Sequence, residues 1–349
     1  MKEGLQKNNE HVVRTCEQEQ VRFATSERQV RSNLRMRAAM IIIVVLVILI
    51  IAWVIAGIMR ERSMFIVAGV ASGLALLSLI QLVPFRLGYT RVKQGYVVTS
   101  CFQVLRRCNY IPDEHKGKPV IGIAAGVFRD RKKMYYIALP GGMTHLGKEC
   151  FMNCRDLRGV TFRGESKLQY VEDRAFSGCY NLYAFCSGRE VVRIGEGAFE
   201  NCRSLRCAYF GGSVEKIGRN AFASCGNLAL VSASDRVTEL KRATFNGCRS
   251  LASLPLSPLL EKIDDDCFGY CAALENVDIP EKVAYIGKGA YTDCRALKEA
   301  VIRSKPEFIG NNACRNCDKA VITFTAVKKQ SKDWNGQWAD KRCTINYAK

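Results

Sequence analysis

Residues 191–208 read VVRIGEGAFENCRSLRCA, and variants of this stretch recur along most of the chain. Each copy has an aromatic residue, then at three-residue intervals a Cys, a Leu and a further apolar residue, here Phe199, Cys202, Leu205 and Ala208. Clear copies begin at Phe151, Phe176, Phe199, Phe222, Phe245, Phe268 and Tyr291, with degraded copies at Phe128 and Cys314. The spacing is 23 residues with a single exception of 25. This regularity predicts a solenoid, because each coil can bury its apolar side only by stacking on its neighbours.

The end of each coil alternates between apolar and polar residues, as in Asn276-Val277-Asp278-Ile279 before Pro280. Alternation of this kind predicts a short strand with one buried face. Equivalent strands in successive coils should pair in parallel, while Gly and Pro mark the corners between them. We therefore expect a solenoid of short parallel strands, one per coil, joined by irregular or short helical turns.

The spacing Val-x-x-Ile-Gly-x-x-Ala-Phe-x-x-Cys-x-x-Leu-x-x-Val, which residues 191–202 match closely, resembles the BspA-type leucine-rich repeat. Residues 111–120 are similar to the usual first coil of that family, and residues 334–338 (WNGQW) resemble its terminal cap. The resemblance covers about residues 110–349. It implies a bacterial-type leucine-rich-repeat solenoid, recognition of proteins or surfaces, adhesion in some members, and no shared catalytic residues.

Two uncharged segments of 22 residues each, 38–59 and 64–85, precede the repeats. Each is long enough to cross a hydrocarbon core of about 30 Å as a helix. With only four residues between them, they predict a transmembrane hairpin rather than two buried core helices. Lys and Arg flank both outer ends, whereas the connecting loop offsets Arg60 and Arg62 with Glu61, so both termini are expected in the cytoplasm. If the second segment did not span, the repeats would lie outside the cell.

These features predict five regions along the chain. They are a polar cytoplasmic segment (1–37), the transmembrane hairpin (38–85), a linker with a capping coil (86–127), the leucine-rich-repeat array (128–323) and a C-terminal cap (324–349).

The chain has 17 Cys, an odd number, so a fully paired disulfide framework is excluded. Eight occupy the repeat position: Cys154, Cys179, Cys202, Cys225, Cys248, Cys271, Cys294 and Cys317. We interpret them as small buried hydrophobic residues rather than as redox or metal groups. The pair Cys314 and Cys317 has the C-x-x-C spacing, but no second pair lies at zinc spacing. A thiol-rich chain fits a reducing compartment, and Cys186 and Cys207, at outward strand positions, are predicted to be the most accessible thiols of the array.

The sequence offers no catalytic, cofactor-binding or metal-binding constellation. Its three His (His11, His115 and His145) are far apart in sequence, and neither standard phosphate-binding glycine motif is present. Asp264-Asp265-Asp266 falls at a turn and is expected to be solvated. We therefore predict no enzymatic activity and no cofactor.

The formal net charge is +19, and residues 87–349 carry +14 of it. Arg follows the repeat Cys in alternate coils, at Arg155, Arg203, Arg249 and Arg295. This row is either a solvated edge or a contact for anionic lipid headgroups or an acidic protein. No nucleic-acid motif accompanies the charge, so nucleic acid is not expected as a partner.

Solenoids usually bind ligands on the exposed face of their sheet, and Arg and Tyr are favoured at binding hot spots. The candidate partner-binding residues, all predicted to point outward, are Arg158, Tyr183, Arg206, Tyr209, Glu275, Asp278 and Lys298. The expected function is non-catalytic protein binding or scaffolding by a membrane-anchored array in the cytoplasm. The alternative is a cell-surface adhesin or recognition protein with the array outside the cell.

Overall fold

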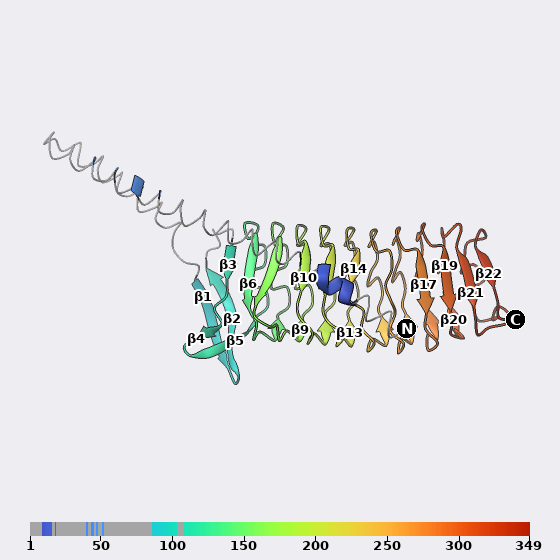
Figure 1. Ribbon diagram of the computed structural model, residues 1–349, viewed down its shortest axis with the longest axis horizontal. Helices are drawn as coiled ribbons and strands as arrows, with labels where there is room; N and C mark the ends of the chain where they lie inside the picture. Colours follow the sequence, from blue (N-terminus) through green and yellow to red (C-terminus); the bar gives the residue numbers. More distant parts are fainter. Residues whose placement is uncertain are drawn as a thin grey trace.

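The computed structural model describes residues 9–15, 86–102 and 108–349, together with single positions at 18, 40, 43, 44, 47 and 51. From residue 86 onward the chain forms one elongated stack of coils (Figure 1). The two predicted membrane segments, 38–59 and 64–85, lie outside the described residues apart from five helical positions in the first. No helix in the described part of the chain is long and apolar enough to cross a bilayer.

Each coil of the central array contributes a two-residue strand to one long sheet, which has twelve strands in all. Its strands are β1 (Arg86–Val92), β2 (Gly95–Phe102), β4 (Glu114–His115), β5 (Lys118–Ile123), β7 (His145–Leu146), β9 (Tyr170–Val171), β11 (Arg193–Ile194), β13 (Lys216–Ile217), β15 (Glu239–Leu240), β16 (Lys262–Ile263), β18 (Tyr285–Ile286) and β20 (Phe308–Ile309). Pairing is parallel from β2 to β20, while β1 and β4 join antiparallel at the N-terminal end.

The strands expected from the alternating pattern form two further parallel sheets. The six-stranded sheet contains β3 (Cys108–Tyr110), β6 (Tyr136–Pro140), β8 (Gly159–Arg163), β10 (Ala184–Cys186), β12 (Cys207–Tyr209) and β14 (Leu230–Val231). The four-stranded sheet contains β17 (Asn276–Ile279), β19 (Glu299–Ile302), β21 (Val321–Phe324) and β22 (Thr344–Asn346). The predicted parallel solenoid is confirmed, but the prediction of one strand per coil was wrong. The additional strand, which belongs to the long sheet, has only two residues in most coils and is too short to show any alternation in the sequence.

A break separates the six-stranded sheet from the four-stranded sheet. Residues 251–257 form no strand, although the repeat places one there. Pro255 occupies an outward position of that expected strand, and proline has no N–H to donate to a neighbouring strand. The array therefore presents two separate sheet surfaces on this side rather than one continuous surface.

Two columns of equivalent contacts run along the core of the array. The repeat aromatic rings stack on one another from Phe128 to Tyr291, with centroids 5.1–5.5 Å apart and planes within 11° of parallel. Beside them, each of the eight repeat Cys is fully buried and its thiol donates to the carbonyl of the aromatic residue one coil earlier, at 3.0–3.3 Å. We call this second column the thiol ladder. Both columns follow directly from the repeat, because parallel stacking places equivalent residues in contact.

The turn that leads into each ladder Cys needs a left-handed backbone. Asn153, Asn201 and Asn316 all precede a ladder Cys and have φ of 57–61°. Asn tolerates this conformation better than most residues because its short side chain can bond locally to the backbone. The left-handed turn thus favours Asn, Asp or Gly before the repeat Cys, although Ser224 and Tyr270 adopt the same conformation.

Candidate protein-binding face

In the middle of the six-stranded sheet, small and apolar side chains line the outward side. Ala184 pairs with Gly159 on one side and with Cys207 on the other, and Cys207 pairs with Leu230. The intervening strand residues, such as Phe185, point the other way into the core. We call this outward surface, centred on β10, β12 and β14, the binding face.

A short helix from the N-terminal region lies on the binding face. Residues 9–15 are helical and cross these strands in the middle of the array (Figure 1). Val12 is completely buried in a cluster with Ala184, Cys186, Cys207 and Tyr209, against which Val13, Tyr183 and Leu230 also pack. The binding face is therefore covered by a short, mostly polar helix that packs its two valines against it.

A pair of hydrogen bonds fixes one end of this helix to the array. The Asn9 side chain donates from Nδ2 to the Ala233 carbonyl at 2.9 Å, and its Oδ1 accepts from the Ala233 N–H at 2.8 Å. The amide satisfies both backbone groups of a residue that follows β14, the last strand before the break. Because these bonds have a defined direction, they set the position of the helix along the face.

This helix corrects three of our sequence-based predictions. Tyr209 was expected to be outward and available for binding, and Cys186 and Cys207 were expected to be accessible thiols. All three point outward from the sheet, but Tyr209 and Cys186 are 8% exposed and Cys207 is 0% exposed. They are buried because the helix covers them. The only sequence signal was Val12-Val13, an apolar pair within a mostly polar segment.

Stacked Arg and Tyr side chains form the edge of the binding face. The Arg206 guanidinium lies 4.7 Å from the Tyr183 ring centre, and that of Arg158 lies 5.3 Å from Tyr135. Tyr183 and Arg206 immediately precede β10 and β12, so the pair adjoins the docked helix. Stacking holds the planar guanidinium in place while its N–H groups remain available to an acceptor. The structure thus brings Arg158, Tyr183 and Arg206 together on one edge, immediately before their strands.

A second stack lies in the neighbouring turns. Tyr180 lies between Arg155 and Arg203, at 5.4 and 5.0 Å from their guanidinium carbons. The arginine row was predicted from the sequence, but its aromatic partner Tyr180 was not, nor was Tyr135, the partner of Arg158. The repeat spacing itself contained the signal, since Arg155, Tyr180 and Arg203 are equivalent positions in successive coils.

The remaining candidates belong to the region of the four-stranded sheet and are already paired. Asp278 lies in β17, and Glu275 and Lys298 immediately precede β17 and β19. Lys298 Nζ lies 2.9 Å from Glu275 Oε2, and Arg303 makes bonds of 2.7 and 3.1 Å to the two oxygens of Asp278. The break at residues 251–257 separates them from Arg158 and Tyr183. The structure thus divides the predicted set into two groups on separate sheets.

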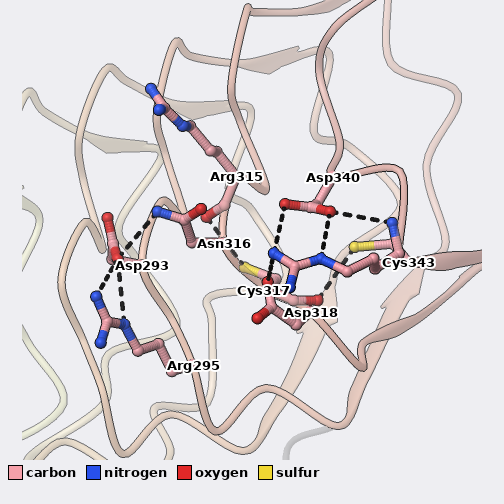
Figure 2. Close-up of polar contacts among 9 residues, drawn as sticks. Asp293, Arg295, Arg315, Asn316, Cys317, Asp318, Asp340 and Cys343 are labelled. Atoms are coloured by element: carbon pink, nitrogen blue, oxygen red, sulfur yellow. Dashed lines mark hydrogen bonds and ion pairs between the residues drawn. The ribbon is translucent and has the colours of Figure 1, made fainter.

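The cysteines are placed for packing rather than for chemistry. Burial raises the pKa of the Cys271 and Cys317 thiols to about 12, so almost none is thiolate at neutral pH. In the C-x-x-C pair, the Cys317 thiol donates to the Tyr291 carbonyl. The Cys317 carbonyl accepts from the Cys343 thiol (Figure 2). Within residues 86–102 and 108–349 we find no group of three His, Cys, Asp or Glu arranged to hold a metal ion.

Ion pairs at the C-terminal end join the last coil to the array. Arg342 contacts both Asp340 and Asp318. Asp293 accepts from Arg295 and from Asn316 (Figure 2). The Arg342 guanidinium lowers the pKa of Asp340 to about 2. Nearby, Trp334 and Trp338 are buried against Phe324. These contacts close the C-terminal end of the core.

The model of the BspA type leucine rich repeat region matches residues 107–229 and 215–333, with six copies. The chain belongs to this family. Among solved structures, the Treponema pallidum leucine-rich-repeat protein (TpLRR) is 26% identical with a TM-score of 0.48, over 55% of this chain and 90% of its own. A leucine-rich-repeat protein from Bacteroides ovatus is 17% identical with a TM-score of 0.45, over 76% and 99%. No curated protein matches the chain, and the BspA-type match indicates a repeat protein rather than an enzymatic family.

Proposed function

We propose that this BspA-type repeat protein is a membrane-anchored, non-catalytic scaffold that binds other proteins on its binding face. The observation that carries the proposal is the burial of Val12 on that face. A sheet surface that buries an apolar side chain of a docked helix and carries Arg–Tyr stacks along its edge has the composition of a protein-recognition surface. Leucine-rich-repeat proteins generally act by binding rather than by catalysis.

The five described positions in the first apolar segment support the membrane anchor. Met40, Ile43, Val44, Val47 and Ile51 are helical, and each is 47–59% exposed. Large apolar side chains exposed in this way are unfavourable in water and favourable in lipid.

The docked N-terminal helix supports an even number of membrane crossings. The two apolar segments, 38–59 and 64–85, separate residues 9–15 from the array in the sequence. A contact between these parts within one chain requires both on the same side of the membrane. Two crossings allow this contact and one does not. The flanking Lys and Arg favour the cytoplasmic side, and the thiol ladder requires reduced cysteines, which fits the same compartment.

Cysteine labelling in intact cells tests the anchor and its orientation. Cys207 is unsuitable as a reporter because it is buried, so new thiols are introduced as Ser63→Cys in the short loop and Lys332→Cys at an exposed position of the array. With a membrane-impermeant maleimide, we expect Ser63→Cys to react in intact cells and Lys332→Cys to react only after permeabilisation. The unmodified protein gives the background.

The two positions distinguish the alternatives. Reaction of Lys332→Cys in intact cells would place the array outside, as in an adhesin. Absence of reaction at both positions until permeabilisation would argue against the hairpin.

Photo-crosslinking tests the binding face itself. A photoreactive residue replaces Arg158, at the edge of the binding face, or Lys216, an exposed residue of the long sheet that serves as the matched control. We expect discrete protein adducts from position 158 and none from position 216. Equal adducts at both positions, or none at position 158, would contradict the proposal.

A further inference from the structure

We propose that residues 9–15 are an intramolecular ligand that blocks the binding face, and that a partner must displace them. The partner that fits is an amphipathic helix of another protein, with small aliphatic residues on one side and an amide side chain at one end. This inference rests on the proposed function, because it assigns the regulation and the partner chemistry of the same face.

The docked helix has the features of a ligand rather than of a structural element. Glu10, His11 and Arg14 are exposed, whereas Val12 is buried. The sheet beneath needs no covering to complete its core, because the inward residues Phe185, Ala208 and Val231 already belong to the main core cluster. The helix instead joins the outward residues in a separate small cluster.

The outward residues of the binding face under residues 9–15 differ in size. Directly beneath the helix the outward residues Ala184 and Cys207 are small, so the helix can approach the sheet closely. Tyr183, Tyr209 and Leu230 are larger and surround them. The Val12 side chain packs among these residues and is completely buried there, which is how an apolar residue of an amphipathic helix docks on a partner surface.

The amide of Asn9 replaces a group that the repeat lacks at the sheet break. One coil earlier, the Phe210 N–H donates to the Ser232 hydroxyl at 2.9 Å. The equivalent donor is the Ala233 N–H, and the residue equivalent to Ser232 is Pro255, which has no hydroxyl. Asn9 Oδ1 accepts from that N–H at 2.8 Å. The break therefore creates a specific acceptor requirement, and a partner helix must supply an amide at the same place.

The contact is suited to displacement because it is small. One fully buried side chain and two hydrogen bonds oppose the entropy lost on ordering seven residues. Covalent connection to the array raises the local concentration of the segment and so holds it in place. A separate helix with more apolar contacts can compete with it.

The test uses the full-length protein with Val12→Asp and Asn9→Ala, and with Arg14→Ala as the matched control on the exposed side of the same helix. Alkylation of Cys207 is followed by mass spectrometry. We expect Val12→Asp to raise its rate about tenfold or more, Asn9→Ala to raise it less, and Arg14→Ala to leave it unchanged. Cys207 that stays equally protected in Val12→Asp overturns the proposal. Wild-type protection that falls on dilution also overturns it, because the helix would then come from a second copy.

A synthetic peptide of residues 5–18, with Ser in place of Cys16, tests the face as a helix-binding site. It should bind Val12→Asp protein and protect Cys207 again, while the same peptide with Asp at position 12 should not. If the first peptide neither binds nor protects Cys207, the proposal that the face binds this helix is overturned.

Photo-crosslinking from position 158 distinguishes the intramolecular contact from the proposed partner binding. Val12→Asp should increase the yield of partner adducts. If Val12→Asp exposes Cys207 but leaves the yield of adducts unchanged, the intramolecular contact is supported and the face is not the partner site.

Discussion

Replacing Phe199 with Ala is expected to lower the free energy of unfolding by about 3–5 kcal/mol. The Phe199 ring stacks between Phe176 and Phe222, with centroid distances of 5.2 and 5.4 Å. It also contacts Phe185 at 5.0 Å and Phe210 at 5.6 Å. Its removal leaves a cavity between four other aromatic rings, and the regular stacking on both sides prevents these neighbours from closing it.

The loss should be concentrated near the substituted coil. In a solenoid each repeat contacts only its neighbours, so stability is close to a sum of repeat and interface contributions. Hydrogen exchange measured by mass spectrometry should show lost protection in the coils that contain Phe176, Phe199 and Phe222. The coils from Tyr291 to Phe324 should keep theirs. A uniform loss along the array would contradict this account.

Two variants serve as controls for the aromatic column. Phe199→Leu keeps most of the apolar volume and should cost less than half as much. Phe268→Ala removes a ring that stacks only on Phe245 and Tyr291 among the rings of the described residues. It should therefore cost less than Phe199→Ala. If Phe268→Ala costs as much, the extra contacts with Phe185 and Phe210 do not contribute to stability.

The repeat period made the core predictable from the sequence. A constant spacing of 23 residues places Phe on Phe and Cys beside Cys in any parallel stack, so the columns follow without knowledge of the fold in detail. The two-residue strands, such as Arg193–Ile194, were missed because two residues cannot show an alternating pattern. Their pairing is decided by the coils around them.

The candidate site was only partly predictable, because periodicity shows which residues point outward but not what lies over them. Cys207 and Tyr209 do point outward, yet residues nearly 200 positions away in the sequence cover them. Asp278 also points outward, but Arg303, 25 positions later, pairs with it. Contacts between non-equivalent positions carry no repeat signal, and the binding face depends on such contacts.

The thiol ladder should make the protein unstable in alkali. Burial raises the pKa of Cys271 from 9.0 to about 12, and it raises the pKa of Cys179, Cys202 and Cys248 well above the ordinary value. Because the folded state favours the protonated thiol, its stabilising contribution is complete below pH 9, the unfolded value. It is lost as the pH rises from 9 toward the folded value. The loss is about 1.4 kcal/mol per thiol for each pH unit in that window.

Several ladder thiols act together, so unfolding should occur well below pH 12. We expect circular dichroism to show cooperative loss of structure between about pH 10 and 11. Over the same pH interval, unfolding should expose the buried thiols of the array and make them reactive toward a disulfide reagent. An array that keeps its structure and its protected thiols at pH 11 would show that thiol ionisation does not limit stability.

Cys271→Ala separates the thiol contribution from that of the tyrosines and lysines, which titrate in the same range. At pH 7 the variant should be less stable than the wild type by about 1–2 kcal/mol, because it loses buried sulfur and leaves the Phe245 carbonyl without its thiol donor. Above pH 9 the wild type must unfold or bury a thiolate at this position, and the variant has no such group. The two stability curves should therefore converge near pH 10 and cross above it. Parallel curves from pH 7 to pH 11 would mean that Cys271 ionises in the folded array without cost, and that the ladder is less tightly closed to water than its geometry indicates.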